Sequence, residues 1–374
     1  MEQLKKYKFL SIHKWWLEID KFLFFLILSL ILLGIFFAFT STSSIVADKI
    51  YKNDFVFVLK FLSFSLLSLT ILFFVSTLSL KNLKTLSIVF FLLSIILLFL
   101  VLFIGVEVKG SKRWINLFIL RFQPIELYKP FLIIVIAMIL SFPKIGNLNV
   151  RIILSLIILG ISIFLLLSQP DVGQSFLIAI SWISIVFFSG IAFFKLFFIG
   201  FLILSVLALS LFFFKEKFFY IFKRINVFFD PTKGDNLQAE RALEAIKQGG
   251  FLGRGIGEGI IKDKVPEAHT DFVLAVIGEE FGIITILIIF IISSLILARL
   301  YAKSFYENNN FIKLSVLGLA TLYYTQCIIN IGVTLRLLPN KGMTYPFISY
   351  GGSSMIGSAI LFGLVLSMTS KNRQ

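Results

Sequence analysis

Hydrophobic residues make up 58% of this 374-residue chain, charged residues make up only 15%, and the mean hydropathy is +0.99. A soluble domain of this length needs far more polar surface, so the composition excludes a soluble globular protein and indicates a polytopic membrane protein. The formal net charge is +15, and we expect membrane lipid, not nucleic acid, around the chain. One cysteine and two histidines exclude an internal disulfide and a zinc-type cluster.

Ten apolar runs long enough to cross a bilayer follow one another along the chain. They lie at residues 22–39, 55–79, 86–106, 126–142, 151–168, 174–190, 192–214, 283–300, 312–335 and 347–369. We therefore predict an all-α, polytopic integral membrane protein with about ten transmembrane helices, forming one domain over residues 1–374.

The charges between the runs predict the orientation of the chain. The segment before the first run is basic, and Lys14-Trp15-Trp16 suits anchoring at a membrane interface. An even number of spans puts both termini on one side, which we expect to be the cytoplasm. However, this orientation leaves 20 of the 35 Lys and Arg on the outer side. Half of these lie in one long loop, where they weigh little, but the inverted orientation stays open.

Three polar motifs stand between the early runs. Lys112 and Arg113, next to Trp114, form a basic, aromatic segment that either binds phosphate or anchors the chain among headgroups. Glu126 and Lys129 share one helical face and form either a structural ion pair or a substrate contact. In Gln169-Pro170-Asp171, the aspartate either caps the next helix or takes part in chemistry.

Residues 215–271 are predicted to form one large extracytoplasmic loop. Within it, Leu237–Lys247 has the pattern of a short amphipathic helix, and Gly249-Gly250 ends it. Six glycines between residues 249 and 259 are compatible with an amide nest for phosphate, although ordinary turns fit them better.

Asp271 lies where this loop meets an apolar run, in Pro266-Glu267-Ala268-His269-Thr270-Asp271-Phe272. A carboxylate costs roughly 2.5–3.5 kcal/mol at the centre of a membrane span and less near the interface. A carboxylate in such a place is expected to have a function, and proton abstraction is the candidate. Glu279 and Glu280 follow, and they either orient groups around Asp271 or begin the next span.

Residues 338–354 contain two prolines and several glycines among Ser and Tyr, which excludes an ordinary helix. Irregular backbone at membrane depth is tolerated only when it is buried in protein or lines a wet cavity. The alternative is close helix packing through small residues, since Ser353 and Gly357 are four apart.

The motifs Lys109 to Trp114, Gln123 to Lys129, Gln169 to Gly173, Pro266 to Glu280 and Pro346 to Ser354 together resemble the SEDS family (shape, elongation, division and sporulation). The resemblance covers nearly the whole chain. One departure is Ile125, where the family usually has a small hydroxyl residue beside the glutamate.

The resemblance implies a ten-helix peptidoglycan glycosyltransferase of the bacterial inner membrane, with cytoplasmic termini and a periplasmic active site. Its substrate would be lipid II, an undecaprenyl-pyrophosphate-linked disaccharide peptide. Asp271 would be the general base on the 4-hydroxyl of the acceptor GlcNAc, which attacks the anomeric carbon of the donor MurNAc with inversion. Lys112, Arg113 and Lys129 would neutralise the departing undecaprenyl pyrophosphate. A divalent cation, Mg or Mn, is a candidate cofactor without assigned ligands.

The other expected substrate contacts are Glu126, Gln169, Asp171, His269, Thr270, Ser349, Gly351, Gly352 and Ser353, with Glu267, Glu279 and Glu280 supporting them. His13 to Trp16 and Gly253 to Lys262 resemble the division-type members, which implies the division septum, divisome proteins and a class B penicillin-binding transpeptidase as partners. An elongation-type polymerase is the alternative. A lipid II flippase is the rival from another class, since embedded charges at Glu126, Lys129 and Asp171 also suit a headgroup pathway.

Overall fold

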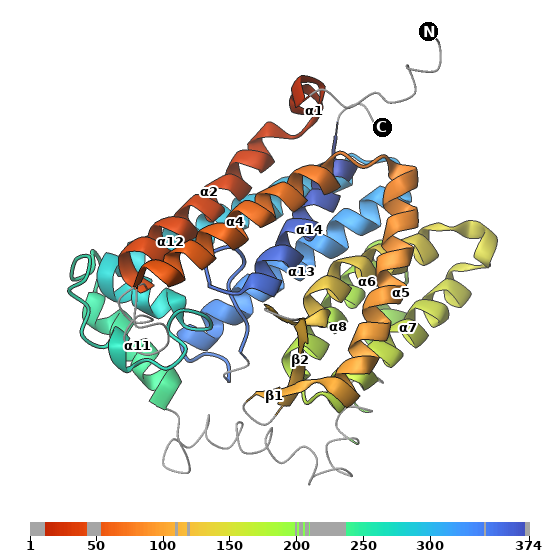
Figure 1. The fold of residues 1–374 in the computed structure, drawn as a ribbon. Helices are drawn as coiled ribbons and strands as arrows, with labels where there is room; N and C mark the ends of the chain where they lie inside the picture. The colour runs from red at the N-terminus through yellow and green to blue at the C-terminus, as the bar shows by residue number, and fades with distance from the viewer. Residues whose placement is uncertain are drawn as a thin grey trace.

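The computed structural model describes residues 12–42, 54–108, 111–117, 120–198, 200–201, 205, 209, 237–339 and 342–370. They form a helical bundle with a small sheet at one end (Figure 1). The long helices are α2 (Lys21–Phe37), α4 (Asp54–Ser76), α5 (Leu80–Ile104), α6 (Pro124–Ser141), α7 (Leu148–Ser168), α8 (Val172–Phe188), α12 (Val273–Phe305), α13 (Asn310–Thr334) and α14 (Gly352–Met368). The shorter ones are α1 (Ile12–Glu18), the π-helix η2 (Ala38–Thr42), the 3₁₀ turns η4 (Pro143–Ile145) and η6 (Lys262–Lys264), and α11 (Leu237–Gly249).

The predicted membrane spans match these helices. Seven described helices are long and apolar enough to cross a membrane, and the 17-residue helices α8 and α14 coincide with two further predicted runs. The predicted run at 192–214 and residues 215–236 of the predicted loop lie largely outside the described residues. The total of ten spans therefore stays a prediction.

Helices α6 and α13 form the centre of the bundle, since 72% of the span window in each is buried, against 28% in α5 and α12. Small residues allow this close packing. A Cβ at Gly318 of α13 would lie 2.4 Å from Ile185 of α8 and 2.8 Å from Ile133 of α6. Large exposed side chains such as Phe99 and Phe103 instead cover the outer helices, where lipid is expected.

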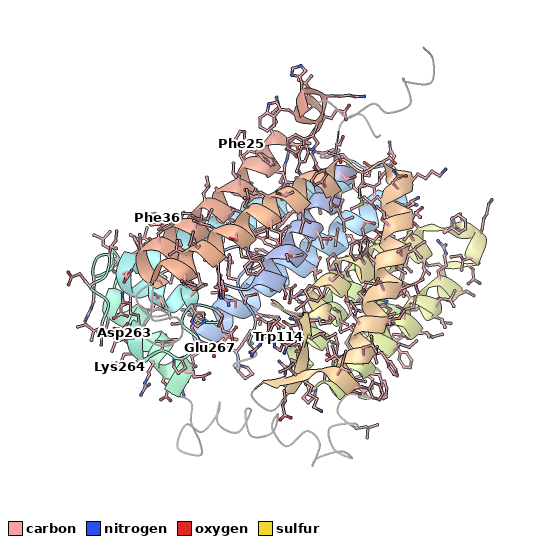
Figure 2. The ribbon with its side chains drawn as sticks, in the orientation of Figure 1. Phe25, Phe36, Trp114, Asp263, Lys264 and Glu267 are labelled. Atoms are coloured by element: carbon pink, nitrogen blue, oxygen red, sulfur yellow. The ribbon has the colours of Figure 1, made fainter. Side chains whose placement is uncertain are left out.

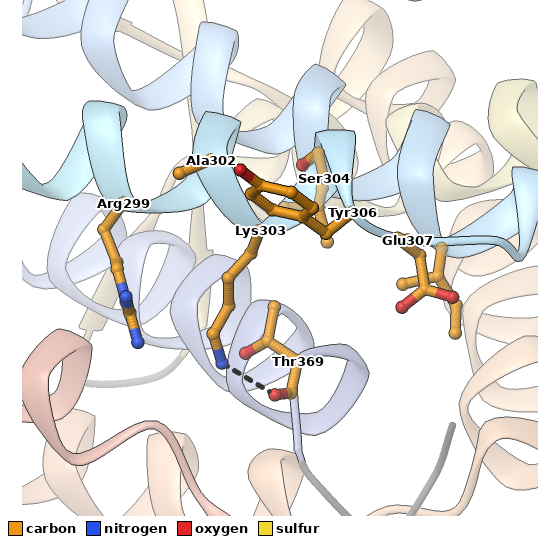
Figure 3. Close-up of a pocket in the computed structure, with 9 residues that line it drawn as sticks. Arg299, Ala302, Lys303, Ser304, Tyr306, Glu307 and Thr369 are labelled. Atoms are coloured by element: carbon orange, nitrogen blue, oxygen red, sulfur yellow. Dashed lines mark hydrogen bonds between the residues drawn. The ribbon is translucent and has the colours of Figure 1, made fainter.

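The starts and ends of three helices meet at one end of the bundle. Asp20, which caps α2, accepts hydrogen bonds from Arg299 at 2.9 Å and lies 2.9 Å from the Lys303 ammonium; both cations stand near the end of α12. Lys303 also donates to the carbonyl of Thr369 beyond α14 (Figure 3). The neighbouring cavity of about 180 Å³ is thus bordered by cations that are already paired. α1 and the end of α14 lie at this end of the bundle, opposite the sheet and α11 (Figure 1).

A three-stranded antiparallel sheet adds to the helical fold between α5 and α6. Its strands are β1 (Val106–Val108), β2 (Ser111–Leu117) and β3 (Leu120–Phe122), in the order β1-β2-β3. The basic, aromatic segment around Lys112 and Arg113 is therefore mostly strand. Its Val, Trp and Ile residues favour pleated structure, and pairing satisfies backbone groups at the edge of the bundle.

Helix α12 begins at Val273, ten residues before the predicted run. Gly282 has a φ of 80° and interrupts the helix, so α12 consists of two helical parts joined by a kink. The first part is buried and carries Glu279 and Glu280. Because these two carboxylates interrupt the apolar pattern, the sequence did not indicate that the helix begins this early.

Candidate active site

A cavity of about 310 Å³ lies at the end of the bundle that carries the sheet and α11. Separate chain segments form its walls: β2, the first turns of α6, α8 and α11, the turn before α12, and the broken segment before α14. The lining residues are Ser111, Arg113, Trp114, Gln123, Glu126, Gln174, Gln238, Glu267, Thr270, Asp271, Gly342, Met343, Thr344, Tyr350, Gly351, Ser353 and Ser354. Figure 2 labels two of these residues, Trp114 and Glu267, at this end of the bundle.

A tight turn presents Asp271 to the cavity. Glu267 begins the turn with a φ of 58°, a left-handed conformation that is uncommon for a residue with a side chain. The Thr270 amide donates to the Glu267 carbonyl at 3.1 Å, and the Thr270 hydroxyl donates to the Glu267 carboxylate at 3.0 Å. The Tyr350 amide donates to the His269 carbonyl at 2.9 Å, which ties the turn to the broken segment. The backbone that carries Asp271 is thus held from several sides.

Two amides in α13, Gln326 and Asn330, organise this region, and sequence reasoning missed both. The Nδ2 group of Asn330 donates to the carbonyls of Asp271 at 2.9 Å and of Met343 at 2.6 Å. Gln326 donates to the Thr344 carbonyl at 3.0 Å. The usable signal was a pair of amides four residues apart within an apolar run, since such a pair lies on one face of the helix.

Glu126 and Lys129 form the predicted ion pair, with 3.0 Å between Nζ and Oε1. Both are buried, and Gln326 and Gln174 bond to Lys129 and Glu126 at 3.2 Å. Glu126 lines the cavity, whereas Lys129 lies deeper, in a small adjoining pocket. Gln174 also lines the cavity, where its side-chain amide donates to the Glu126 carboxylate and helps to hold it at the cavity wall.

Arg113 and Lys112 diverge at an irregularity of the sheet. Val106 pairs with Trp114 and Glu107 with Lys112, so Arg113 is the extra residue of β2, and a bulge of this kind redirects a side chain. Arg113 lines the cavity, donates to the carbonyls of Gln169 and Pro170, and lies 3.6 Å from the Asp171 carboxylate. Lys112 is exposed and is not among the lining residues.

Asp171 and Gln169 support Arg113 and are not among the residues that line the cavity. Asp171 accepts from the Gln174 amide at 3.3 Å, so the predicted helix cap is confirmed. Burial raises the pKa of Asp171, and the nearby Arg113 charge opposes that rise. Gln169 donates to the Leu98 carbonyl at 2.7 Å, which fixes the turn against α5.

The broken segment both lines the cavity and packs helices, so both interpretations of it hold. Gly351 and Ser353 line the cavity, and the Ser353 hydroxyl accepts from the Gln123 amide at 3.1 Å. Two predicted contacts point elsewhere: Ser349 accepts from the Tyr345 amide at 2.9 Å, and a Cβ at Gly352 would meet the Phe64 ring at 2.5 Å. Neither of these two is among the lining residues, because the path of the segment turns them into the protein.

Glu279 and Glu280 bind the glycine-rich segment. Glu279 accepts from the amides of Ile260, Ile261 and Lys262 at 2.7–2.8 Å. Glu280 accepts from the Gly257 amide at 3.1 Å and pairs with the Lys262 ammonium. The amides of this segment therefore do bind an anion, which was the less favoured interpretation of the glycines, but the anion is a carboxylate of the same chain. His269 packs its ring near those of Phe57 and Tyr350.

Within the part of the chain that the structure describes, no group of three or more His, Cys, Asp or Glu side chains could hold a metal ion. Glu126, Glu267 and Asp271 are the carboxylates of the cavity wall. The need for a divalent cation stays a prediction.

These features define a multi-pass membrane protein with a polar, carboxylate-bearing cavity at one end of its helical bundle. The chain belongs to the SEDS family: the model of the FtsW, RodA and SpoVE proteins, described as "Cell cycle protein", matches residues 21–374.

Similar proteins with assigned names and solved structures agree with this. The chain is 33% identical to a Caulobacter vibrioides protein and 34% identical to one from Haemophilus influenzae, over 96% and 95% of its length and 90% and 91% of theirs. Both relatives are named "Probable peptidoglycan glycosyltransferase FtsW". A chain of a peptidoglycan synthase complex that coordinates polymerisation and crosslinking superimposes with a TM-score of 0.79 at 28% identity, covering 95% of this chain and 98% of that one. The rod shape determining protein RodA of Thermus thermophilus gives 0.68 at 27% identity, covering 95% and 97%.

Proposed function

We propose that this protein is a peptidoglycan glycosyltransferase that polymerises lipid II into glycan strands, with Asp271 as its general base. The observation that carries the proposal is the placement of Asp271 in a polar cavity of about 310 Å³, at the end of the bundle that carries the sheet and α11. A lipid-linked sugar presents its reacting atoms at that level of a bilayer. The names of the relatives and of the solved complex support the same reaction class.

In the proposed reaction, the Asp271 carboxylate takes the proton of the acceptor GlcNAc 4-hydroxyl. The hydroxyl oxygen forms a bond to the anomeric carbon of the donor MurNAc. The bond between that carbon and the pyrophosphate oxygen breaks, and its electron pair leaves with undecaprenyl pyrophosphate. Attack from the opposite side converts the α-linked donor into a β-linked glycan.

The departing pyrophosphate needs positive charge within reach. Arg113 is the cation in the cavity wall, with a partly exposed guanidinium that its partners Gln169 and Asp171 hold in place. Lys129 is buried against Glu126, so it would serve the reaction by fixing that carboxylate at the cavity floor. Glu126, Thr270, Gly351 and Ser353 are the proposed sugar and peptide contacts, because they line the cavity.

We place the cavity on the periplasmic side of the bacterial inner membrane and both termini in the cytoplasm. The basic segment before the first span and the shared end of α1 and α14 support this orientation. A class B penicillin-binding transpeptidase and divisome proteins at the septum are the proposed partners. The division-type names of the relatives favour this role over elongation.

The experiment is polymerisation of fluorescent lipid II by the purified protein with its partner transpeptidase, read as a glycan ladder on a gel. Asp271→Asn keeps the shape of the side chain and removes the base, so we expect it to bind the partner but to form no ladder. Asp263→Asn is the matched control, since Asp263 is an exposed carboxylate of the same loop (Figure 2). It should polymerise like the unmodified protein.

Undiminished polymer from Asp271→Asn would overturn the base assignment. If the unmodified complex makes no polymer but moves lipid II headgroups across liposome membranes, the flippase hypothesis replaces the polymerase. Fluorescence microscopy of the tagged protein separates the two cellular roles, because a division-type member gathers at midcell and an elongation-type member along the sidewall.

A further inference from the structure

A group of exposed apolar side chains lies on the glycine-rich segment that follows α11. Phe251 and Leu252 are 77% and 81% exposed, and Ile256 and Ile260 are 57% and 58% exposed. Four large apolar residues within ten positions are unusual on a loop that faces water, and exposed groups of this kind mark sites that meet a membrane or a protein. We call residues 251–260 the apolar loop.

The apolar loop is held rigidly against α12. The Ile283 amide donates to the Gly250 carbonyl at 2.9 Å and the Gly255 amide to the Glu280 carbonyl at 3.0 Å. A Cβ at Gly253 or Gly282 would lie 2.1 Å from backbone of the opposite segment, so the two chains touch without side chains between them. The carboxylates of Glu280 and Glu279 accept hydrogen bonds from the amides of Gly257 and Ile260 in the loop. The exposed side chains are therefore presented by fixed backbone.

The helices packed beside the apolar loop indicate how deep the loop lies in the membrane. The span that starts with α2 runs from Lys21 to Thr40, about 30 Å at 1.5 Å per residue, which is the thickness of the hydrocarbon core. Since Asp20 marks one edge of the core, Phe36 and Phe37 lie near the other. Phe281 of α12 packs against both rings, at 5.6 and 5.3 Å between centroids. Figure 2 likewise places Phe36 nearer than Phe25 to the end with Asp263 and Lys264. The loop, bonded to residues 279–284, therefore lies at the outer edge of the hydrocarbon.

The loop also continues a surface that faces lipid. The exposed stripe of α12 consists of Ile284, Leu287, Ile288, Ile291 and Leu295, which are 42–54% exposed. Its first residue, Ile284, donates its amide to the Phe251 carbonyl. The apolar side chains of the loop thus extend the lipid-facing side of a membrane span.

We propose that the apolar loop inserts Phe251, Leu252 and Ile256 into the headgroup and acyl boundary of the outer leaflet, as an interfacial anchor for the extracytoplasmic loop. Aromatic and aliphatic side chains gain stability at this depth, where fixed loops and amphipathic segments bury them. Through Glu279 and Glu280, the anchor sets the height of the first part of α12, and so of Asp271, relative to the bilayer. The insertion itself does not depend on the reaction that the cavity carries out.

Fluorescence quenching by brominated lipids tests the depth. The buried Cys327 is replaced by Ala, and single cysteines at Leu252, Ile256 or Glu258 are labelled with bimane in nanodiscs. Glu258 is the matched control, since it is an exposed polar residue of the same loop. With bromines on the upper acyl chain, we expect fluorescence to fall about twofold at residues 252 and 256 and to change little at 258, because the quencher acts only by contact within the acyl region.

Equal responses at all three positions, or no quenching at 252 and 256, would overturn the anchor. Labels that are shielded from aqueous iodide only after the partner transpeptidase is added would assign the surface to a protein contact instead. Neither readout uses lipid II, so the outcome is independent of the polymerase assay.

Discussion

Replacing Asn330 by Asp tests whether the amide of α13 sets the position of Asp271. The change keeps size and shape, removes the two N–H donors, and places carboxyl oxygens against the carbonyls of Asp271 and Met343. A buried acceptor left without a partner costs about 1–3 kcal/mol. Since the new carboxyl group recovers one of the two bonds when it is protonated, one carbonyl is left without a partner, and we expect a net loss of about 1–3 kcal/mol.

If that loss falls on the reacting geometry, the polymerisation rate at saturating lipid II drops by about 5- to 150-fold, because about 1.4 kcal/mol corresponds to a factor of ten. The KM for lipid II should change little, because the contact lies behind Asp271 and the substitution leaves the lining side chains in place. The assay is the initial rate of glycan formation at several lipid II concentrations, together with thermal unfolding in detergent.

Asn309→Asp is the matched control. It is the same chemical change at the other end of α13, where the side chain is exposed and caps the helix through Oδ1, a role that Asp also fills. An Asn330→Asp protein with an unchanged rate, or one whose rate falls only in proportion to its folded fraction, would refute the positioning role.

Three further changes give separate tests. Gly342→Ala adds a Cβ 3.2 Å from Oδ2 of Asp271 at a φ of 62°, so we expect polymerisation to fall about tenfold. Gly257→Ala is the control, because Gly257 also has a positive φ but an added Cβ there would meet no neighbouring atom, so this variant should stay active. Equal losses of activity in the two variants would argue for backbone strain alone. Glu279→Gln weakens three bonds to backbone amides and should lower the free energy of unfolding by roughly 2–4 kcal/mol, whereas Glu258→Gln should not; similar melting temperatures would contradict this. Burial acts to raise the pKa of Asp20, but hydrogen bonds from Arg299 and Lys303 outweigh it and hold that pKa below 3.8. The stability that Asp20 adds is therefore present above pH 3.8 and lost as the pH falls through the lowered pKa, so the melting temperatures of the protein and of Asp20→Asn should converge below pH 3.8; a gap that stays constant into strong acid would contradict the argument.

The membrane spans could be predicted because each span is a continuous run of apolar residues, which can be recognised without knowing any tertiary contact. The start of α12 could not, since Glu279 and Glu280 interrupt the apolar pattern and only the distant amides of residues 257–262 explain their burial. The sheet was missed for a similar reason: Val106 was assigned to the end of a predicted span, and its pairing with β2 cannot be seen in the sequence.

The candidate site was predicted in part. Asp271, Glu126 and Arg113 stand out because charges at the edge of a span are rare, and all three line one cavity. Tertiary packing decides which of two adjacent charged side chains faces the cavity. Lys112 and Arg113 are equivalent in the sequence, and only the irregular pairing of β2 with β1 separates them. Asn330 is an ordinary amide until α13 is packed beside Asp271.

The cavity walls come from chain segments that are far apart in sequence, joined by a few bonds such as Tyr350 to His269 and Gln123 to Ser353. No single helix contains the site, so the site is formed only while the helices keep their packing against one another. A detergent that loosens contacts between helices should therefore abolish activity while the circular dichroism of the helices is still intact. Helical content is then a poor guide to whether a preparation of this protein is functional.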